Sequence, residues 1–325
     1  MTLLRCAAVV LAAAVAVSVS AQGAREPLAQ VNAALQAGEA DKALALLNAL
    51  PEAGTRLAEA QNLECRVRLT LEEWDAAAQA CEQAVRLDGQ NSSYHLWLGR
   101  ALGEKASRAS FLSAYSLAKR VRAEFEEAVR LNPRNSEALS DLGEFYKDAP
   151  GVVGGGTSKA EQVAAQLDHV DAARAQVLRA RIAEERKDYG TAERELKLAI
   201  AASEHPARQW TMLASFYRRR ARWTELDWAI HNCVNSAERD KHAGVALYDG
   251  AGVLMESHRD PALAAKMLED YLAGSSITEE APAFVAHLRL ARLKEQLGDA
   301  ASGKRERAAA LALAHEYRPA QEFRH

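Results

Sequence analysis

The sequence repeats itself at a spacing of 34 residues, and this spacing restricts the fold more than any other feature. The segments "GEADKALALL" (38–47) and "EEWDAAAQACEQAVRLDGQN" (72–91) align with Ala43 and Ala77 in register, 34 residues apart. Self-similarity at a fixed period is typical of stacked supersecondary units, because each unit leaves an apolar face that only a neighbour can cover. Further copies occur at 125–135 and 187–200.

The first half of each unit also recurs. The segments "HLWLGRAL" (95–102), "LSDLGEFY" (139–146) and "WTMLASFY" (210–217) each place a leucine directly before glycine or alanine. A small residue at that position lets two antiparallel helices approach closely, and the large residues fill the gaps around it. Ala, Leu, Glu and Arg are abundant, and all are good helix formers. The pattern therefore predicts an all-α fold built from helix pairs.

The order Trp-x2-Leu-Gly-x2-Tyr, then Ala-x3-Phe, then Pro resembles the tetratricopeptide repeat family. The resemblance covers nearly all of residues 22–325, which we expect to form a single domain. It implies an α-α superhelix, a right-handed solenoid of about eight helix-turn-helix units, whose first helices line a concave groove that holds peptides or protein partners. The units are expected to start near residues 24, 58, 92, 136, 173 and 207, followed by a looser unit over 242–272 and a last one over 284–317.

Two segments depart from the repeat. Gly99 and Ala128 are 29 residues apart, about ten more than the repeat requires. The extra residues, around 103–118, predict a longer loop or a lengthened second helix. The other departure, around 148–158, contains a glycine-rich stretch. The C-terminal tail, "EYRPAQEFRH", is expected to cover the exposed end of the stack.

The glycine-rich stretch invites comparison with a phosphate-binding loop. Gly151 and Gly156 have the spacing of that motif, but Thr157-Ser158 stand where Lys-Thr is required, and the preceding segment reads as a helix instead of a strand. We interpret the stretch as a bend between two helices, with Thr157 or Ser158 capping a second helix that begins near Lys159. Its "APG-x-x-GG" pattern resembles a subgroup of exported bacterial tetratricopeptide proteins and implies no activity.

Residues 1–21 have the pattern of a secretory signal peptide. Arg5 lies near the start, an apolar run extends from residue 6 to 19, and small residues precede a cleavage site after Ala21. An uncleaved anchor is the alternative, but the apolar run is shorter than the roughly 20 residues that a membrane span needs. We therefore expect a periplasmic or secreted protein, which contacts a membrane only through the signal segment if that segment is retained.

Charge and motifs exclude several classes of function. Removal of Arg5 with the signal leaves 40 basic and 44 acidic residues, a net charge of −4. Proteins that bind nucleic acids or anionic membranes need a basic excess instead. No zinc, nucleotide or nucleophile motif occurs, so we predict no catalytic, cofactor-binding or metal-binding residue. His95 is expected to pack in the core, and His231 and Cys233 point to different faces of one helix.

Two cysteines occupy facing positions within one unit. Cys65 lies at the small position of the first helix, and Cys81 at a large position of the second. In an oxidising compartment they can form a disulfide if their Cα atoms lie within about 4.4–6.8 Å. Alternatively, both are buried thiols that pack as small hydrophobic groups. The sequence leaves both alternatives open and slightly favours the thiols.

The repeat register also outlines the concave groove. Arginines from different units in one lane would suit an acidic segment or a chain-terminal carboxylate. A solvated face balanced by local glutamates is an equally supported alternative. The carboxylate-clamp subgroup of the family carries an asparagine at the groove position, and this sequence has none there, so a specific reader of C-terminal peptides is not predicted. The groove positions are Arg66, Arg100, Glu144, Arg181 and Ser215, with Lys147 and Arg218 one turn further on.

These observations predict a non-catalytic scaffold or adaptor that binds protein or peptide in the bacterial cell envelope. Nucleotides and nucleic acids are not expected partners. One alternative is an accessory or inhibitory subunit of an envelope enzyme, such as a peptidase or glycan machinery. Another is a structural element that assembles with itself through its end helices.

Overall fold

The computed structural model describes residues 26–51, 54 and 57–323, so the predicted signal peptide lies outside the described residues. Within them the chain forms eight successive helix pairs, which confirms the predicted all-α solenoid. The described residues contain no strand, only an isolated bridge between Thr278 and Ala281. None of the described helices combines the length and the apolar character that a membrane span requires.

The pairs begin close to the predicted unit starts. The first pair consists of residues 26–36 and α2 (Ala40–Asn48). The next pairs are α4 (Ala58–Thr70) with α5 (Trp74–Leu87), α6 (Ser92–Ser107) with α7 (Phe111–Leu131), and α8 (Ser136–Asp148) with α9 (Thr157–Leu167). They are followed by α10 (Ala172–Glu185) with α11 (Tyr189–Ala202), α12 (Ala207–Arg219) with α13 (Trp223–Ala237), α14 (Gly244–Glu256) with α15 (Pro261–Ala273), and α16 (Ala283–Gln296) with α17 (Ala300–Leu313). The short α18 (Arg318–Gln321) comes last.

The small residues of the repeat lie where helices touch. A Cβ atom at Gly99 would lie 2.4 Å from the ring of Phe125, and one at Gly143 would lie 2.3 Å from the side chain of Leu178. Both distances are far below van der Waals contact, so an added Cβ would push the Phe125 ring or the Leu178 side chain aside. The small position of the repeat therefore determines how closely successive helices pack.

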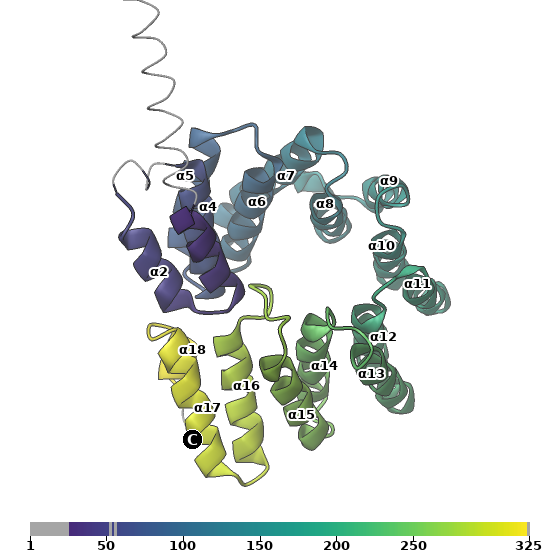
Figure 1. The fold of residues 1–325 in the computed structure, drawn as a ribbon. Helices are drawn as coiled ribbons and strands as arrows, with labels where there is room; N and C mark the ends of the chain where they lie inside the picture. The colour runs from purple at the N-terminus through teal and green to yellow at the C-terminus, as the bar shows by residue number, and fades with distance from the viewer. Residues whose placement is uncertain (1–25, 52–53, 55–56, 324–325) are drawn as a thin grey trace, which may run out of the picture.

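The stack of helices curves until its two ends meet, so the molecule is a ring (Figure 1). Buried apolar residues of the first two units, including Leu28 and Val31, share one core with Phe284 and Tyr317 of the C-terminal region. The rings of Phe284 and Tyr317 pack edge to face with their centroids 4.9 Å apart. We call this contact between the first and last units the joint.

Polar contacts accompany the shared core at the joint. The Tyr317 hydroxyl donates to a carboxylate oxygen of Glu72 at 2.9 Å, and Gln36 donates to Glu279 at 3.1 Å. The backbone N–H of His315 donates to the Asp41 carboxylate at 2.8 Å. The C-terminal tail, with Tyr317 buried, thus covers the N-terminal end of the stack.

The first departure from the repeat lies in the third pair. At 21 residues, α7 is longer than the second helices of the other units, such as α5 and α11 with 14 residues each. The hairpin formed by α6 and α7 therefore extends beyond its neighbours. Phe111 and Leu112, at the start of α7, are largely exposed there.

The second departure is a compact turn. Residues Gly151–Val153 form a 3-10 turn, labelled η1, between α8 and α9, and Gly154 has a left-handed backbone with φ of +94°. The guanidinium of Arg122 donates to the Val153 carbonyl at 3.2 Å, which fixes the turn against α7. The predicted cap by Thr157 or Ser158 is wrong. Because α9 already begins at Thr157, the capping position falls on Gly156, which has no side chain.

Candidate functional site

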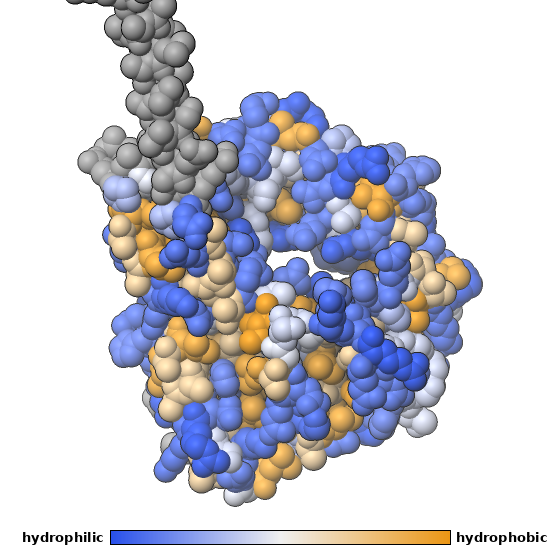
Figure 2. Space-filling model, viewed as in Figure 1, coloured by the Kyte–Doolittle hydropathy of each residue, from blue (hydrophilic) through white to orange (hydrophobic). Residues whose placement is uncertain are grey.

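A hollow of about 1180 Å³ opens into the interior of the ring beside the joint. We call it the joint hollow. In the space-filling view an opening is visible at the centre of the ring (Figure 2). The hollow is lined from one side by residues of α4, α6 and α8, and from the other by residues of α12, α14 and α16 and by the loop before α16. Most of the lining residues belong to the first helices of the units, and the second helices α5 and α7 add Trp74, Val121 and Phe125.

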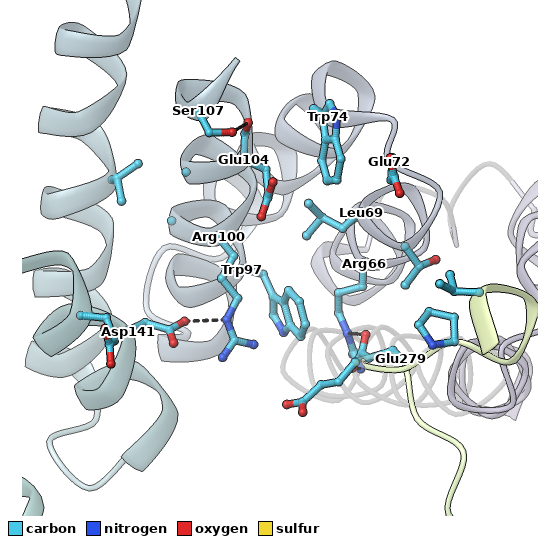
Figure 3. A pocket seen from close by; sticks show the side chains of 18 of the residues that line it. Arg66, Leu69, Glu72, Trp74, Trp97, Arg100, Glu104, Ser107, Asp141 and Glu279 are labelled. Atoms are coloured by element: carbon cyan, nitrogen blue, oxygen red, sulfur yellow. Dashed lines mark hydrogen bonds and ion pairs between the residues drawn. The ribbon is translucent and has the colours of Figure 1, made fainter. Parts of the chain in front are cut away.

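Aromatic rings and arginines alternate along the wall. Trp97 on α6 has the guanidinium groups of Arg66 and Arg100 over its ring, at 5.2 and 4.6 Å from the centroid. Trp97 and Arg100 are three residues apart, so one turn of helix places both on the inward face. On the opposite side Arg289 lies over Tyr248 at 4.0 Å. Figure 3 shows Trp97 between Arg100 and Arg66. Such stacking fixes the rings and contributes about 0.5–2 kcal/mol for each pair.

Three arginines of the hollow are held by carboxylates of other units or of the loop before α16. Arg66 on α4 donates from Nε to Glu279 at 2.9 Å, across the joint. Arg100 donates from Nε to Asp141 on α8 at 2.6 Å and also bonds Glu137. These bonds cross between units, so they fix the curvature of the wall as well as the position of each side chain.

Burial changes the pKa of Asp141 in the wall and of Asp249, the residue after the lining residue Tyr248 on α14. Burial raises the pKa of Asp141, although the Arg100 guanidinium opposes this shift. Burial also raises the pKa of Asp249, and Glu280 adds to the effect while Arg208 counters it. Other carboxylates lie close to both groups, Glu137 to Asp141 and Glu280 to Asp249, and add to the upward shift of each pKa.

Three of the seven predicted groove residues lie at the joint hollow. Arg66, Arg100 and Glu144 line the joint hollow, whereas Lys147, Arg181, Ser215 and Arg218 are not part of its lining. Each arginine of the predicted lane has a carboxylate within ion-pair distance. Arg181 lies 3.9 Å from Glu144, and Arg218 lies 2.9 Å from Glu256. Carboxylates of neighbouring helices and loops therefore lie beside all of these arginines.

Several wall residues were missed by the sequence prediction. Trp97 could have been found, because it lies three residues before the predicted Arg100 on the same helix face. Glu279 and Glu280 could not, because they follow α15 in a connecting segment without a repeat register. Tyr317 lies beyond the last repeat and reaches the hollow only because the ring closes.

The cysteines are also assigned by the structure. Cys65 and Cys81 form a disulfide between α4 and α5, with Cα atoms 5.2 Å apart, so the slightly favoured alternative of two free thiols is wrong. Cys233 is a free, buried thiol, and burial raises its pKa to about 12, which keeps it protonated and unreactive.

The two histidines considered in the sequence analysis, His95 and His231, both form hydrogen bonds within the protein. His95 is buried and hydrogen-bonds Glu124 at 2.7 Å and the Gly89 carbonyl at 3.1 Å. The hydrogen bond to Glu124 raises the pKa of His95. His231 bonds the Asp227 carbonyl of its own helix. In the part of the chain that the structure describes, no group of three or more His, Cys, Asp or Glu side chains could hold a metal ion.

Comparison with known proteins supports the fold. No family model matches the sequence, and no curated protein matches it either. Among solved structures the chain is similar to a thermophilic tetratricopeptide protein of Thermus thermophilus, with a TM-score of 0.50 and 17% identity. The match covers 59% of this chain and 98% of that one. At this identity the similarity shows the fold alone: a tetratricopeptide-like helical repeat.

Proposed function

We propose that this protein is a non-catalytic scaffold that binds an extended segment of a partner protein or a peptide in the joint hollow. The hollow itself is the observation that carries the proposal. Its volume of about 1180 Å³ exceeds what a small ligand needs, since such pockets measure about 300–1000 Å³. Its walls carry fixed rings and oriented charges, which are the groups that hold side chains of a partner.

We place this work in the bacterial cell envelope, outside the cytoplasm. Two observations support the location. The first 21 residues have the pattern of a signal peptide cleaved after Ala21. Independently, Cys65 and Cys81 form a disulfide, which persists in oxidising compartments. The "APG-x-x-GG" bend, similar to that of exported tetratricopeptide proteins, agrees with this location.

The closed ring weighs against the alternative of self-assembly through end helices. The apolar faces at the two ends of the stack cover each other at the joint, where Leu28, Phe284 and Tyr317 are buried together. A structural element that polymerises needs those faces to be free. An accessory or inhibitory subunit of an envelope enzyme would use the same hollow, with a segment of the enzyme as its ligand.

An unbiased peptide screen tests the proposal. A library of displayed random peptides is selected on the mature protein, and the affinity of an enriched peptide is measured by calorimetry. We expect Trp97→Ala to weaken binding at least tenfold, because truncation of an aromatic anchor costs about 2 kcal/mol. Trp223→Ala is the matched control, since Trp223 is exposed on α13 away from the hollow. Failure to enrich any peptide, or equal binding by the Trp97 variant, would refute the proposal.

A further inference from the structure

The walls of the joint hollow carry more negative than positive groups. Seven carboxylates and four guanidinium groups line it, and no lysine or histidine does, which gives a formal balance of −3. The carboxylates come from the α4–α5 turn, α6, α8 and the loop before α16. They are Glu72, Glu104, Asp141, Glu144, Asp148, Glu279 and Glu280.

The positive groups of the wall are already engaged. Arg66 pairs with Glu279, Arg100 with Asp141, and Arg208 with Glu280 at 2.9 Å. The guanidinium of the fourth, Arg289, lies over the Tyr248 ring at 4.0 Å from the centroid. At three of the four arginines an acidic ligand would have to displace an internal carboxylate, whereas a basic ligand would displace none.

The wall carboxylates Glu144 and Asp148 share the ammonium group of Lys147. The Lys147 ammonium nitrogen lies 3.5 Å from a Glu144 carboxylate oxygen and also contacts the Asp148 carboxylate. The Arg181 guanidinium lies 3.9 Å from the Glu144 carboxylate. A further cation brought by a ligand would add attraction here without displacing an internal group.

At one end of the hollow, a basic side chain of this protein already contacts the wall. Arg108, which follows α6, lies over the Trp74 ring at 4.2 Å and bonds the Glu104 carboxylate at 2.7 Å. Trp74 and Glu104 both line the hollow and are seen at the same end of it (Figure 3). The Arg108 side chain is half exposed, so it can leave this place without opening the core.

We propose that the joint hollow binds a basic segment, and that an arginine or lysine of that segment takes the place of Arg108 between Trp74 and Glu104. The inference rests on the proposed function and names the chemistry of its ligand. A ring and a carboxylate together provide cation–π attraction and a charge-assisted hydrogen bond to the same cation. Arg108 acts as an internal competitor for this position.

Labelled model peptides test the inference. Three 12-residue peptides, in which Arg, Glu or Gln alternates with Ala and Gly, are titrated with the mature protein and followed by fluorescence anisotropy. We expect the arginine peptide to bind at least tenfold more tightly than the glutamate and glutamine peptides. We also expect added salt to weaken that binding, since charge pairs are screened.

Variants of the internal competitor make the test specific. Arg108→Ala should tighten binding of the arginine peptide at least threefold because it vacates the position, and Glu104→Gln should weaken it. Arg186→Ala is the matched control, since Arg186 forms a comparable exposed pair with Glu161 outside the hollow. Circular dichroism confirms that each variant is folded.

The different failures are distinguishable from one another. Unchanged or weaker binding by the Arg108 variant, or preference for the glutamate peptide, would overturn the inference. Absence of binding by all three model peptides would also overturn it. If a peptide from the random library still binds through Trp97 in that case, the proposed function stands without a basic ligand.

Discussion

At the scale of single residues, Cys65 and Cys81 show what the repeat pattern of the sequence can predict about a pair of side chains. The repeat register places them opposite each other on α4 and α5, and the structure joins them in a disulfide. The register could not decide between a bond and two thiols, because facing positions in a helix pair suit either one. Only the distance between the two helices, with Cα atoms 5.2 Å apart, makes the bond attainable.

Loss of this disulfide should destabilise the second unit. Closing a loop of this size contributes about 3 kcal/mol by restricting the unfolded chain. We expect the double variant Cys65→Ala, Cys81→Ala to unfold at a lower temperature than the native protein, and reductant to lower the melting temperature of the native protein only. Thiol titration of the unfolded, non-reduced mature protein should find one thiol, that of Cys233. A count of three would show that the bond is absent.

At the scale of elements, the turn between α8 and α9 was predicted correctly from the sequence in one respect and wrongly in another. The glycines indicated a bend between two helices, and η1 lies there with Gly154 in a left-handed conformation. The start of α9 was placed two residues too late, because serine and threonine are also compatible with the first turn of a helix. Similarly, the extra residues near 103–118 allowed a loop or a longer helix, and α7 is a longer helix.

Two glycines of this turn should differ in their tolerance of alanine. A Cβ atom at Gly155 would lie 1.8 Å from the Ala149 carbonyl oxygen, whereas one at Gly151 would meet nothing within 4 Å. We expect Gly155→Ala to destabilise the protein by about 2 kcal/mol through overpacking, and Gly151→Ala to change stability little. Chemical denaturation of the two variants side by side measures the difference. Equal stabilities would contradict the close approach of Gly155 to Ala149.

At the scale of the whole molecule, closure of the ring gives the last residues of the chain a role in the interior. Tyr317 packs on Phe284, bonds Glu72 and lines the joint hollow. A solenoid with open ends would leave the first and last units with contacts on one side only. Here the ends stabilise each other, and the site that we propose for partners includes both of them.

Truncation of Tyr317 should therefore open the ring as well as weaken the fold. We expect Tyr317→Ala to cost about 3 kcal/mol, as for other buried aromatic residues, and to raise the radius of gyration measured by small-angle X-ray scattering. Leu297→Ala, at an exposed position on the last unit, is the control and should change neither quantity. An unchanged radius of gyration in a folded Tyr317 variant would show that this contact does not hold the ring closed.

The sequence by itself determined the helix pairs, their order and their phase, because these depend on residues within one 34-residue unit. It indicated Arg66 and Arg100 as inward residues for the same reason. Tertiary structure alone decided the closure of the ring, the partners of those arginines and the negative balance of the hollow. These depend on small rotations between successive units that add up around the stack and bring Glu72 and Tyr317, 245 residues apart, into contact.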